Sequence, residues 1–245
     1  MIYDLVIFDL DGTLIDTIAD LGEAVNYALQ KRGWPLHSIE EYKGMVGHGV
    51  RNLVIAAMPE DKREDAIIDA CLADFKEYYT AHIDVHTRPY PGMQDLVRDL
   101  DAAGVKLAVA SNKFQSGAEH LVKEFFPQPF VAILGDRPGA PLKPDPQIVA
   151  EVMAAATERV PRGVKTGFGF FRSVEKNKSC GAADDVAAKA VLVGDSATDM
   201  RTAANGGIDS IGVSWGFRPR ADLEPLAGHV VDTVDELRSL LGLPD

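Results

Sequence analysis

Cysteines and long apolar runs are scarce in this sequence. Its two cysteines, Cys71 and Cys180, lie far apart and form no CxxC pair, so they predict neither a disulfide framework nor a cysteine zinc site. No apolar run is long enough to span a bilayer. Acidic residues near the N-terminus also interrupt the apolar stretch that a signal peptide needs. We expect a cytoplasmic protein with no membrane partner.

Basic residues are also outnumbered. The chain has 25 Lys and Arg against 37 Asp and Glu, which gives a net charge of -12. Such a chain repels the phosphate backbone of nucleic acids and anionic lipid headgroups, so neither is an expected partner. A hydrophobic share of 46% over 245 residues is enough for a sizeable core. The composition predicts no particular oligomeric state.

Short apolar runs alternate with helical patterns along most of the chain. These runs cover residues 3–8, 105–110, 130–134, 190–193, 208–213 and 229–231. Strands that alternate with helices predict an α/β fold with a Rossmann-like parallel sheet covered on both faces. In such sheets ligands bind beyond the carboxyl ends of the strands. Motifs that follow different strands are therefore expected to meet at one edge.

Residues 16–87 have a different pattern. Apolar residues recur there at helical spacing, and Ser38 with Glu41 matches a capping box at the start of a helix. No convincing strand is visible in this segment. We therefore predict a helical domain at residues 16–87, inserted into a core formed by residues 1–15 and 88–245.

Residues 157–189 form an atypical insertion in this core. The segment is rich in Gly, Phe and basic residues, in contrast to the acidic chain as a whole. A solvated surface excursion is the simplest interpretation, and a lid for a partner or substrate is the alternative. Because it leaves the end of a helix and enters the start of a strand, we expect both ends on the side of the sheet away from the catalytic loops.

The first two motifs supply polar groups at strand ends. Asp9 and Asp11 follow the first strand, so one carboxylate can act as a nucleophile while the other transfers protons. Paired aspartates also occur in ordinary turns. Ser111 and Asn112 follow the second core strand, where a hydroxyl and an amide can donate hydrogen bonds to phosphoryl oxygens or cap the next helix.

The other two motifs add a cation and two more carboxylates. Lys143 precedes Pro144, whose ring restricts the backbone, so its ammonium group can be directed into a site rather than into solvent. Asp195 and Asp199 follow a later strand. Magnesium prefers oxygen ligands, so Asp9, Asp195 and a main-chain carbonyl suit it, with Asp199 as a support or a helix cap.

All four motifs, in this order and each after an apolar strand, resemble those of the haloacid dehalogenase superfamily of phosphotransferases. The resemblance covers nearly the whole chain and implies a Rossmann-like core with an inserted helical cap. It implies that Asp9 is the nucleophile, and that Asp11 is the acid and base and gives its main-chain carbonyl to magnesium. It further implies that Ser111 and Lys143 bind the phosphoryl group and that Asp195 is a metal ligand.

Within this superfamily the chain looks most like the phosphoglycolate phosphatases. The likeness lies in three core runs, 90–92, 111–113 and 143–146, and in Gly47, His48 and Gly49 of the cap. It implies a magnesium-dependent phosphatase that acts on a small phosphomonoester, 2-phosphoglycolate, through a phosphoaspartate. Arg51, beside the glycine turn, can be a cation for the substrate carboxylate or a solvated residue at the start of a helix.

Three alternatives differ in chemistry. A dehalogenase of the superfamily would use Asp9 but would not be expected to have an acid at position 11. A sugar-phosphate phosphatase or phosphomutase could hold a second charged group with Lys43 or Arg51. A catalytically silent binding module would lack a motif residue, and none is missing.

Overall fold

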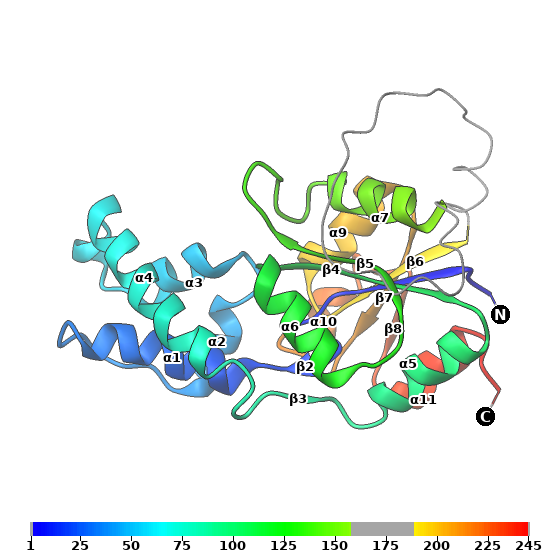
Figure 1. Cartoon of the computed structure of the whole chain (residues 1–245), viewed down its shortest axis with the longest axis horizontal. Coiled ribbons are helices and arrows are strands. Elements are labelled where there is room, and N and C mark those ends of the chain that lie inside the picture. The colour runs from blue at the N-terminus through cyan, green and yellow to red at the C-terminus, as the bar shows by residue number, and fades with distance from the viewer. Residues whose placement is uncertain (1, 158–188, 245) are drawn as a thin grey trace.

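The computed structural model describes residues 2–157 and 189–244, and its centre is a six-stranded parallel sheet. The strand order is β5-β4-β1-β6-β7-β8 (Figure 1). The strands are β1 (Leu5–Phe8), β4 (Lys106–Phe114), β5 (Phe130–Asp136), β6 (Ala190–Gly194), β7 (Asp209–Val213) and β8 (His229–Val231). Apart from its two end residues, the insertion predicted at 157–189 lies outside the described residues.

Both faces of the sheet are buried because its strands carry apolar side chains in both directions. In β1, Leu5, Val6, Ile7 and Phe8 are all fully buried. Since side chains alternate along a strand, Val6 and Phe8 join one hydrophobic cluster, and Leu5 and Ile7 join the other. A continuous apolar strand of this kind is typical of a parallel sheet with helices on both sides.

Helices cover the two faces of the sheet. On one face lie α7 (Gln147–Thr157) and α9 (Ala197–Gly206), and Val152 of α7 packs in the cluster with Ile7. The other face is covered by α5 (Met93–Ala102), α6 (Gln115–Phe125) and α11 (Val234–Leu240). The α/β fold that the sequence predicts is confirmed. None of the helices within the described ranges has the length and apolar character needed to span a membrane.

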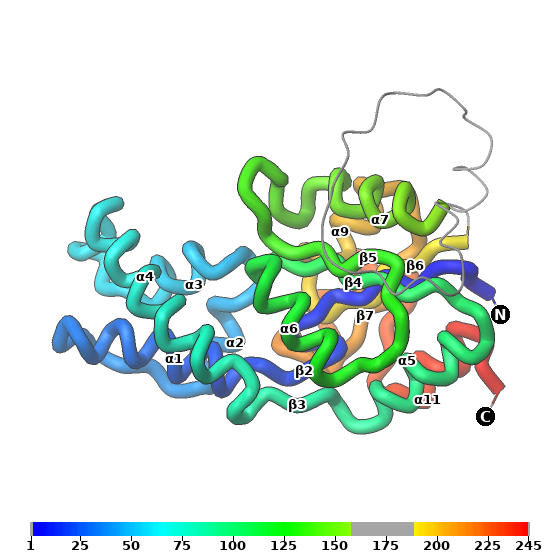
Figure 2. Tube along the Cα trace, viewed as in Figure 1, coloured from blue at the N-terminus to red at the C-terminus, as the bar shows by residue number. Residues whose placement is uncertain are grey.

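Four α-helices between residues 17 and 82 form a separate group, which we call the cap. They are α1 (Ile18–Gln30), α2 (Ile39–Met45), α3 (Val50–Ala57) and α4 (Asp65–Ala81), with a short 3-10 helix, η1 (Glu60–Lys62), before α4. The cap lies at the end of the molecule opposite the chain termini (Figures 1 and 2). Ser38 and Glu41 form the predicted capping box at the start of α2.

The cap joins the sheet through a small antiparallel ribbon that the sequence does not predict. β2 (Ile15–Asp16) pairs with β3 (Arg88–Pro89) where the chain enters and leaves the cap. The prediction of a segment without strands from residue 16 onward is therefore wrong at Asp16. Two-residue strands carry too little pattern to be recognised, and they form only when a distant segment pairs with them.

The carboxylate of Asp20 fixes the same junction. It is buried and accepts the backbone N–H of His86 at 2.9 Å and that of Thr87 at 2.8 Å. The Thr87 hydroxyl donates to it as well, at 2.7 Å. Hydrogen bonds to a charged group are roughly twice as strong as neutral ones. Asp20 therefore ties the first turn of α1 to the chain that returns from α4.

We predict that Asp20→Ala lowers the free energy of unfolding by about 1.5–3 kcal/mol, because it leaves buried N–H groups without an acceptor. Urea unfolding followed by circular dichroism measures the loss. Asp84→Ala is the control, since it removes only a half-exposed pair with His120 and should cost less than about 1 kcal/mol. Equal losses in the two variants would contradict the role given to Asp20.

Candidate active site

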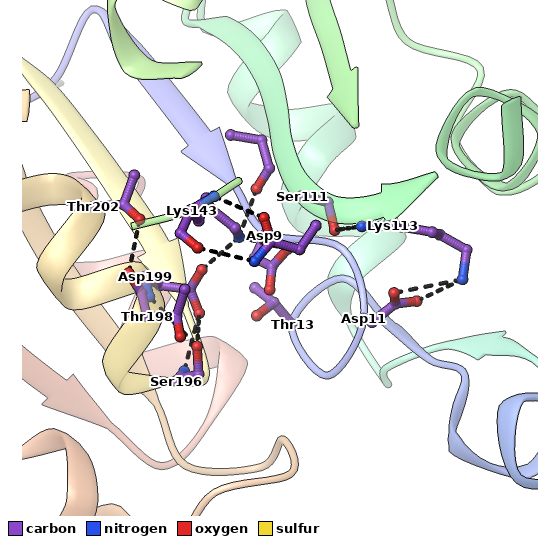
Figure 3. Close-up of polar contacts among 12 residues, drawn as sticks. Asp9, Asp11, Thr13, Ser111, Lys113, Lys143, Ser196, Thr198, Asp199 and Thr202 are labelled. Carbon is purple, nitrogen blue, oxygen red and sulfur yellow. Dashed lines mark hydrogen bonds and ion pairs between the residues drawn. The ribbon is translucent and has the colours of Figure 1, made fainter. Parts of the chain in front are cut away.

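Four segments that are far apart in the sequence meet at the carboxyl edge of the sheet. Asp9 follows β1, Ser111 lies in β4, Lys143 lies in the loop after β5, and Asp195 follows β6. Because β4, β1 and β6 are neighbours in the sheet, Ser111 and Lys143 lie close to Asp9 (Figure 3), and Asp195 lines the same cavity. The backbone N–H of Asp9 donates to the carbonyl of Val193 at 2.8 Å, which fixes the end of β1 against β6.

Asp9 and Lys143 form a buried ion pair. The Nζ atom of Lys143 lies 2.9 Å from Oδ1 of Asp9. This contact lacks hydrogen-bond geometry, so Oδ1 is a buried oxygen without a hydrogen-bond partner. Burial and the nearby carboxylate of Asp199 raise the pKa of Asp9 to about 6, and Lys143 opposes the shift. A further positive charge beside Asp9 would therefore stabilise its carboxylate.

Asp199 holds Lys143 in place. The Nζ atom of Lys143 donates to Oδ1 of Asp199 at 2.6 Å and to the carbonyl of Ala110 at 2.8 Å. Burial alone would lower the pKa of Lys143, but the carboxylates of Asp199 and Asp9 raise it above its usual value. The other oxygen of Asp199 accepts the N–H and the hydroxyl of Ser196, which caps α9. Asp199 thus has the predicted capping role at the start of α9, and it also holds Lys143.

Asp195 completes a group of three buried carboxylates. Its Oδ2 accepts the N–H of Phe217 at 2.7 Å. Burial, followed by the carboxylates of Asp199 and Asp9, raises the pKa of Asp195 well above its usual value. One oxygen of each of the three carboxylates lies within 4.8 Å of the others. Such a set of oxygen donors fits a hard divalent cation such as magnesium.

Two glycines make room for the Asp195 side chain. Gly12 has a φ of +84°, and a Cβ atom on it would lie 2.4 Å from Oδ2 of Asp195. A Cβ atom on Gly216 would lie 2.3 Å from Cβ of Asp195. A side chain at either position would displace the carboxylate, so the turn after Asp11 and the loop after β7 both need glycine there.

Asp11 points away from Asp9 and toward Lys113 (Figure 3). The Nζ atom of Lys113 donates to Asp11 at 3.0 Å and to the hydroxyl of Tyr79 at 2.6 Å. Tyr79 belongs to α4, so this contact runs from the sheet to the cap. No separate role for Lys113 is predicted from the sequence. Strand periodicity could have indicated one, because residues 111 and 113 of a strand share a face.

The amide of Asn112 is engaged by the backbone of two loops. Its Oδ1 accepts the N–H of Lys143 at 2.8 Å, and its Nδ2 donates to the carbonyls of Lys143 and Gly47. The sequence predicts that Asn112 binds phosphate, whereas these contacts have it position the Lys143 loop. The neighbouring Ser111 hydroxyl accepts a 3.3 Å hydrogen bond from Lys113 N–H and keeps its own hydrogen for a ligand.

A cavity of about 50 Å³ lies between this edge and the cap. Asp9, Ser111 and Lys143 line it from the sheet, and Val50 and Phe75 line it from the cap. One water molecule needs roughly 10–15 Å³ in comparable terms, so the cavity has room for only a small ligand. It brings together a carboxylate, a hydroxyl group and an ammonium group.

Of the four cap residues expected to contact the substrate, two line the cavity and two do not. Gly47 and Gly49 line the cavity, whereas His48 and Arg51 are not among the lining residues. The guanidinium of Arg51 pairs with two carboxylates of α4, and its side chain is 42% exposed. Arg51 therefore lies at the surface of the cap in this structure.

A different arginine reaches the cavity from the core side. Arg218 follows β7, next to Phe217, and lines the cavity. Its guanidinium donates to the main-chain carbonyls of Lys43 and Val46 in the cap, the latter at 2.7 Å. Sequence reasoning missed Arg218, because an arginine in a loop follows no strand or helix pattern.

Known proteins of one family match this chain along almost its whole length. A model for the haloacid dehalogenase-like hydrolase family matches residues 6–159, and one for HAD-like hydrolases matches residues 143–237. A phosphoglycolate phosphatase of Mesorhizobium japonicum is 31% identical over 230 residues, which are 91% of this chain and 88% of that protein. A phosphoglycolate phosphatase of Caulobacter vibrioides is 31% identical over 245 residues, and the match covers 98% of this chain and 88% of that protein.

A solved structure agrees with these relatives. A protein of Lactobacillus delbrueckii subsp. bulgaricus, to which phosphoglycolate phosphatase activity is attributed, has a TM-score of 0.80 and 32% identity, with 100% of each chain covered. The two family matches together include Asp9, Ser111, Lys143 and Asp195. With this site, this fold and these relatives, the chain belongs to the haloacid dehalogenase-like hydrolase family.

Proposed function

We propose that this hydrolase, a phosphatase, acts on 2-phosphoglycolate through a phosphoaspartate on Asp9, with magnesium as its cofactor. The position of Asp9 carries the proposal. Its carboxylate borders a small cavity 2.9 Å from the Lys143 ammonium group, and one of its oxygens accepts no hydrogen bond. A carboxylate held in this way is suited to attack phosphorus.

Magnesium fits the acidic side of the cavity. The carboxylates of Asp9 and Asp195 and the main-chain carbonyl of Asp11 would hold it, with Asp199 in support. Bound there, the ion would offset the negative charges of nucleophile and phosphate, which otherwise repel each other. Burial and then the neighbouring carboxylates raise the pKa values of Asp9 and Asp195, and Lys143 offsets the shifts only in part, which supports this assignment.

The reaction then proceeds in two steps. An oxygen of Asp9 attacks phosphorus, the bond from phosphorus to the glycolate oxygen breaks, and Asp11 gives that oxygen a proton. In the second step Asp11 takes a proton from water, and the water oxygen attacks the phosphoaspartate and releases inorganic phosphate. Asp11 pairs with Lys113 here, so its side chain must rotate toward the cavity to transfer protons.

Other groups hold the phosphoryl oxygens. Ser111 can donate its hydroxyl hydrogen to one of them, and the ammonium charge of Lys143 offsets their negative charge. Asp199 keeps Lys143 in position, and Asn112 fixes the loop from which Lys143 extends.

The substrate is assigned from size and relatives together. The cavity of about 50 Å³ has little room beyond a phosphoryl group and a few further atoms. A sugar phosphate would require the cap to move away from the sheet. Relatives that are 31% identical along nearly the full chain are phosphoglycolate phosphatases.

We predict that Asp9→Asn abolishes phosphoglycolate turnover and leaves the fold intact, because an amide oxygen is too weak a nucleophile to attack phosphorus. Asp4→Asn is a matched control, since Asp4 lies just before β1 and its exposed side chain pairs, among the described residues, with Lys189. Phosphate release and thermal unfolding are measured for both variants. Turnover near the wild-type rate in a folded Asp9→Asn protein would remove Asp9 from its role.

We also predict that activity requires magnesium and that excess chelator abolishes it. Full activity in chelator would contradict a metal-assisted reaction. Thermal unfolding gives a second reading, independent of turnover. The pKa of Asp9 rises from 3.8 to about 6 in the folded protein, so its ionisation destabilises the fold as pH increases across that interval.

Magnesium binds the ionised carboxylates, so it should raise the melting temperature more at about pH 7.5 than at about pH 5. Asp9→Asn should reduce this gain. An equal gain at both pH values, unchanged in the variant, would place the bound ion elsewhere.

A further inference from the structure

Three cationic side chains line the cavity: Lys113, Lys143 and Arg218. The two lysines are each paired with carboxylates of the site. Arg218 differs, because its partners within residues 2–157 and 189–244 are main-chain carbonyl oxygens. Carbonyl groups are neutral, so these partners do not offset the positive charge of the guanidinium at the cavity wall.

The carbonyl partners of Arg218 lie at the carboxyl end of α2. They belong to Lys43, Gly44 and Val46, with N···O distances of 3.4 Å to Gly44 and 2.7 Å to Val46. The last carbonyls of a helix lack partners within the helix and attract cations. A guanidinium has five N–H groups, so some remain for an anion after these contacts are made.

The loop of Arg218 is fixed to the floor of the active site. The N–H of Phe217 donates to Asp195 at 2.7 Å, and the indole N–H of Trp215 donates to the carbonyl of Thr13 at 3.2 Å. On the cap side, Nη2 of Arg218 lies 3.9 Å from the position of a Cβ atom on Gly47. The guanidinium therefore lies beside the glycine turn of the cap, on a loop that also contacts the proposed magnesium ligand Asp195.

The cap's own candidate cations are already paired. Arg51 forms ion pairs with Asp65 and Asp69 at the start of α4. The ammonium group of Lys43 lies 2.8 Å from Glu40, and only the main-chain carbonyl of Lys43 faces Arg218. Neither side chain lines the cavity.

We propose that Arg218, a core residue, determines substrate specificity by binding the carboxylate of a small phosphomonoester whose phosphoryl group lies at Asp9. This inference rests on the proposed function, since it assumes a carboxylate next to the phosphorylated carbon. The planar guanidinium matches a carboxylate with two parallel hydrogen bonds. The same guanidinium also binds the end of α2, so Arg218 couples carboxylate binding to the position of the cap.

Steady-state hydrolysis of 2-phosphoglycolate and of ethyl phosphate tests the proposal, because the two esters differ chiefly in the carboxylate. Arg218→Ala should lower kcat/KM for phosphoglycolate roughly 10- to 100-fold, as expected for loss of a charge-assisted contact. Turnover of ethyl phosphate should fall much less, because this ester has no carboxylate for Arg218 to bind, and circular dichroism shows whether the variant is folded. Arg218→Lys keeps the positive charge but not the two parallel N–H donors of the guanidinium, so it should recover part of the preference for phosphoglycolate.

The matched control is Arg220→Ala. Arg220 begins α10 (Arg220–Leu223), pairs with Glu224 and Asp232, and should leave the preference for phosphoglycolate unchanged. Equal losses on both esters in Arg218→Ala would make Arg218 a clamp between core and cap and overturn the proposal. So would an unchanged preference, or a preference lost in Arg51→Ala instead. An equal kcat/KM of the wild-type enzyme for ethyl phosphate and phosphoglycolate would refute the proposed substrate itself.

Discussion

The buried ammonium group of Lys143 is the contact on which the rest of the site depends. It joins Asp9 to Asp199 in a largely buried site, where an unpaired carboxylate would be strongly destabilising. Asp199 is fixed in turn by Ser196, and the backbone of Lys143 is fixed by Asn112. These links join segments of four strands, β1, β4, β5 and β6. One ammonium group cannot balance three carboxylates, and this surplus of negative charge is the physical basis of the proposed magnesium binding.

The contacts between core and cap start from residues next to this charged centre. Asn112 donates to the carbonyl of Gly47, Lys113 to the hydroxyl of Tyr79, and Arg218 to the carbonyl of Val46. Asn112 and Lys113 follow Ser111 directly, and Arg218 follows Phe217, whose N–H binds Asp195. A change in cap position therefore acts on the neighbours of the proposed catalytic groups. In the proposed reaction Asp11 must leave Lys113, and Lys113 also contacts Tyr79 of the cap.

The sheet and the core of the site could be predicted from the sequence because both depend on local pattern. Apolar runs mark the six strands, and polar motifs at strand ends mark their shared edge. The missed features depend on contacts between distant segments: Lys113 meets Asp11 across 102 residues, and Arg218 meets Val46 across 172. Arg51 has a suitable charge and position in the sequence, but folding brings two carboxylates of α4 against it.

Transfer of the phosphoryl group through the carboxylate of Asp9 is tested most directly by trapping the phosphoenzyme. Asp11→Asn removes the proposed acid and base, and an aryl phosphate has a leaving group that needs no proton. Acid quench during turnover with magnesium, followed by peptide mass spectrometry, then shows where the phosphoryl group is held. We predict a hydroxylamine-sensitive phosphoryl group on Asp9. A phosphoryl group on another residue, or steady phosphate release with no phosphorylated peptide, would contradict the mechanism.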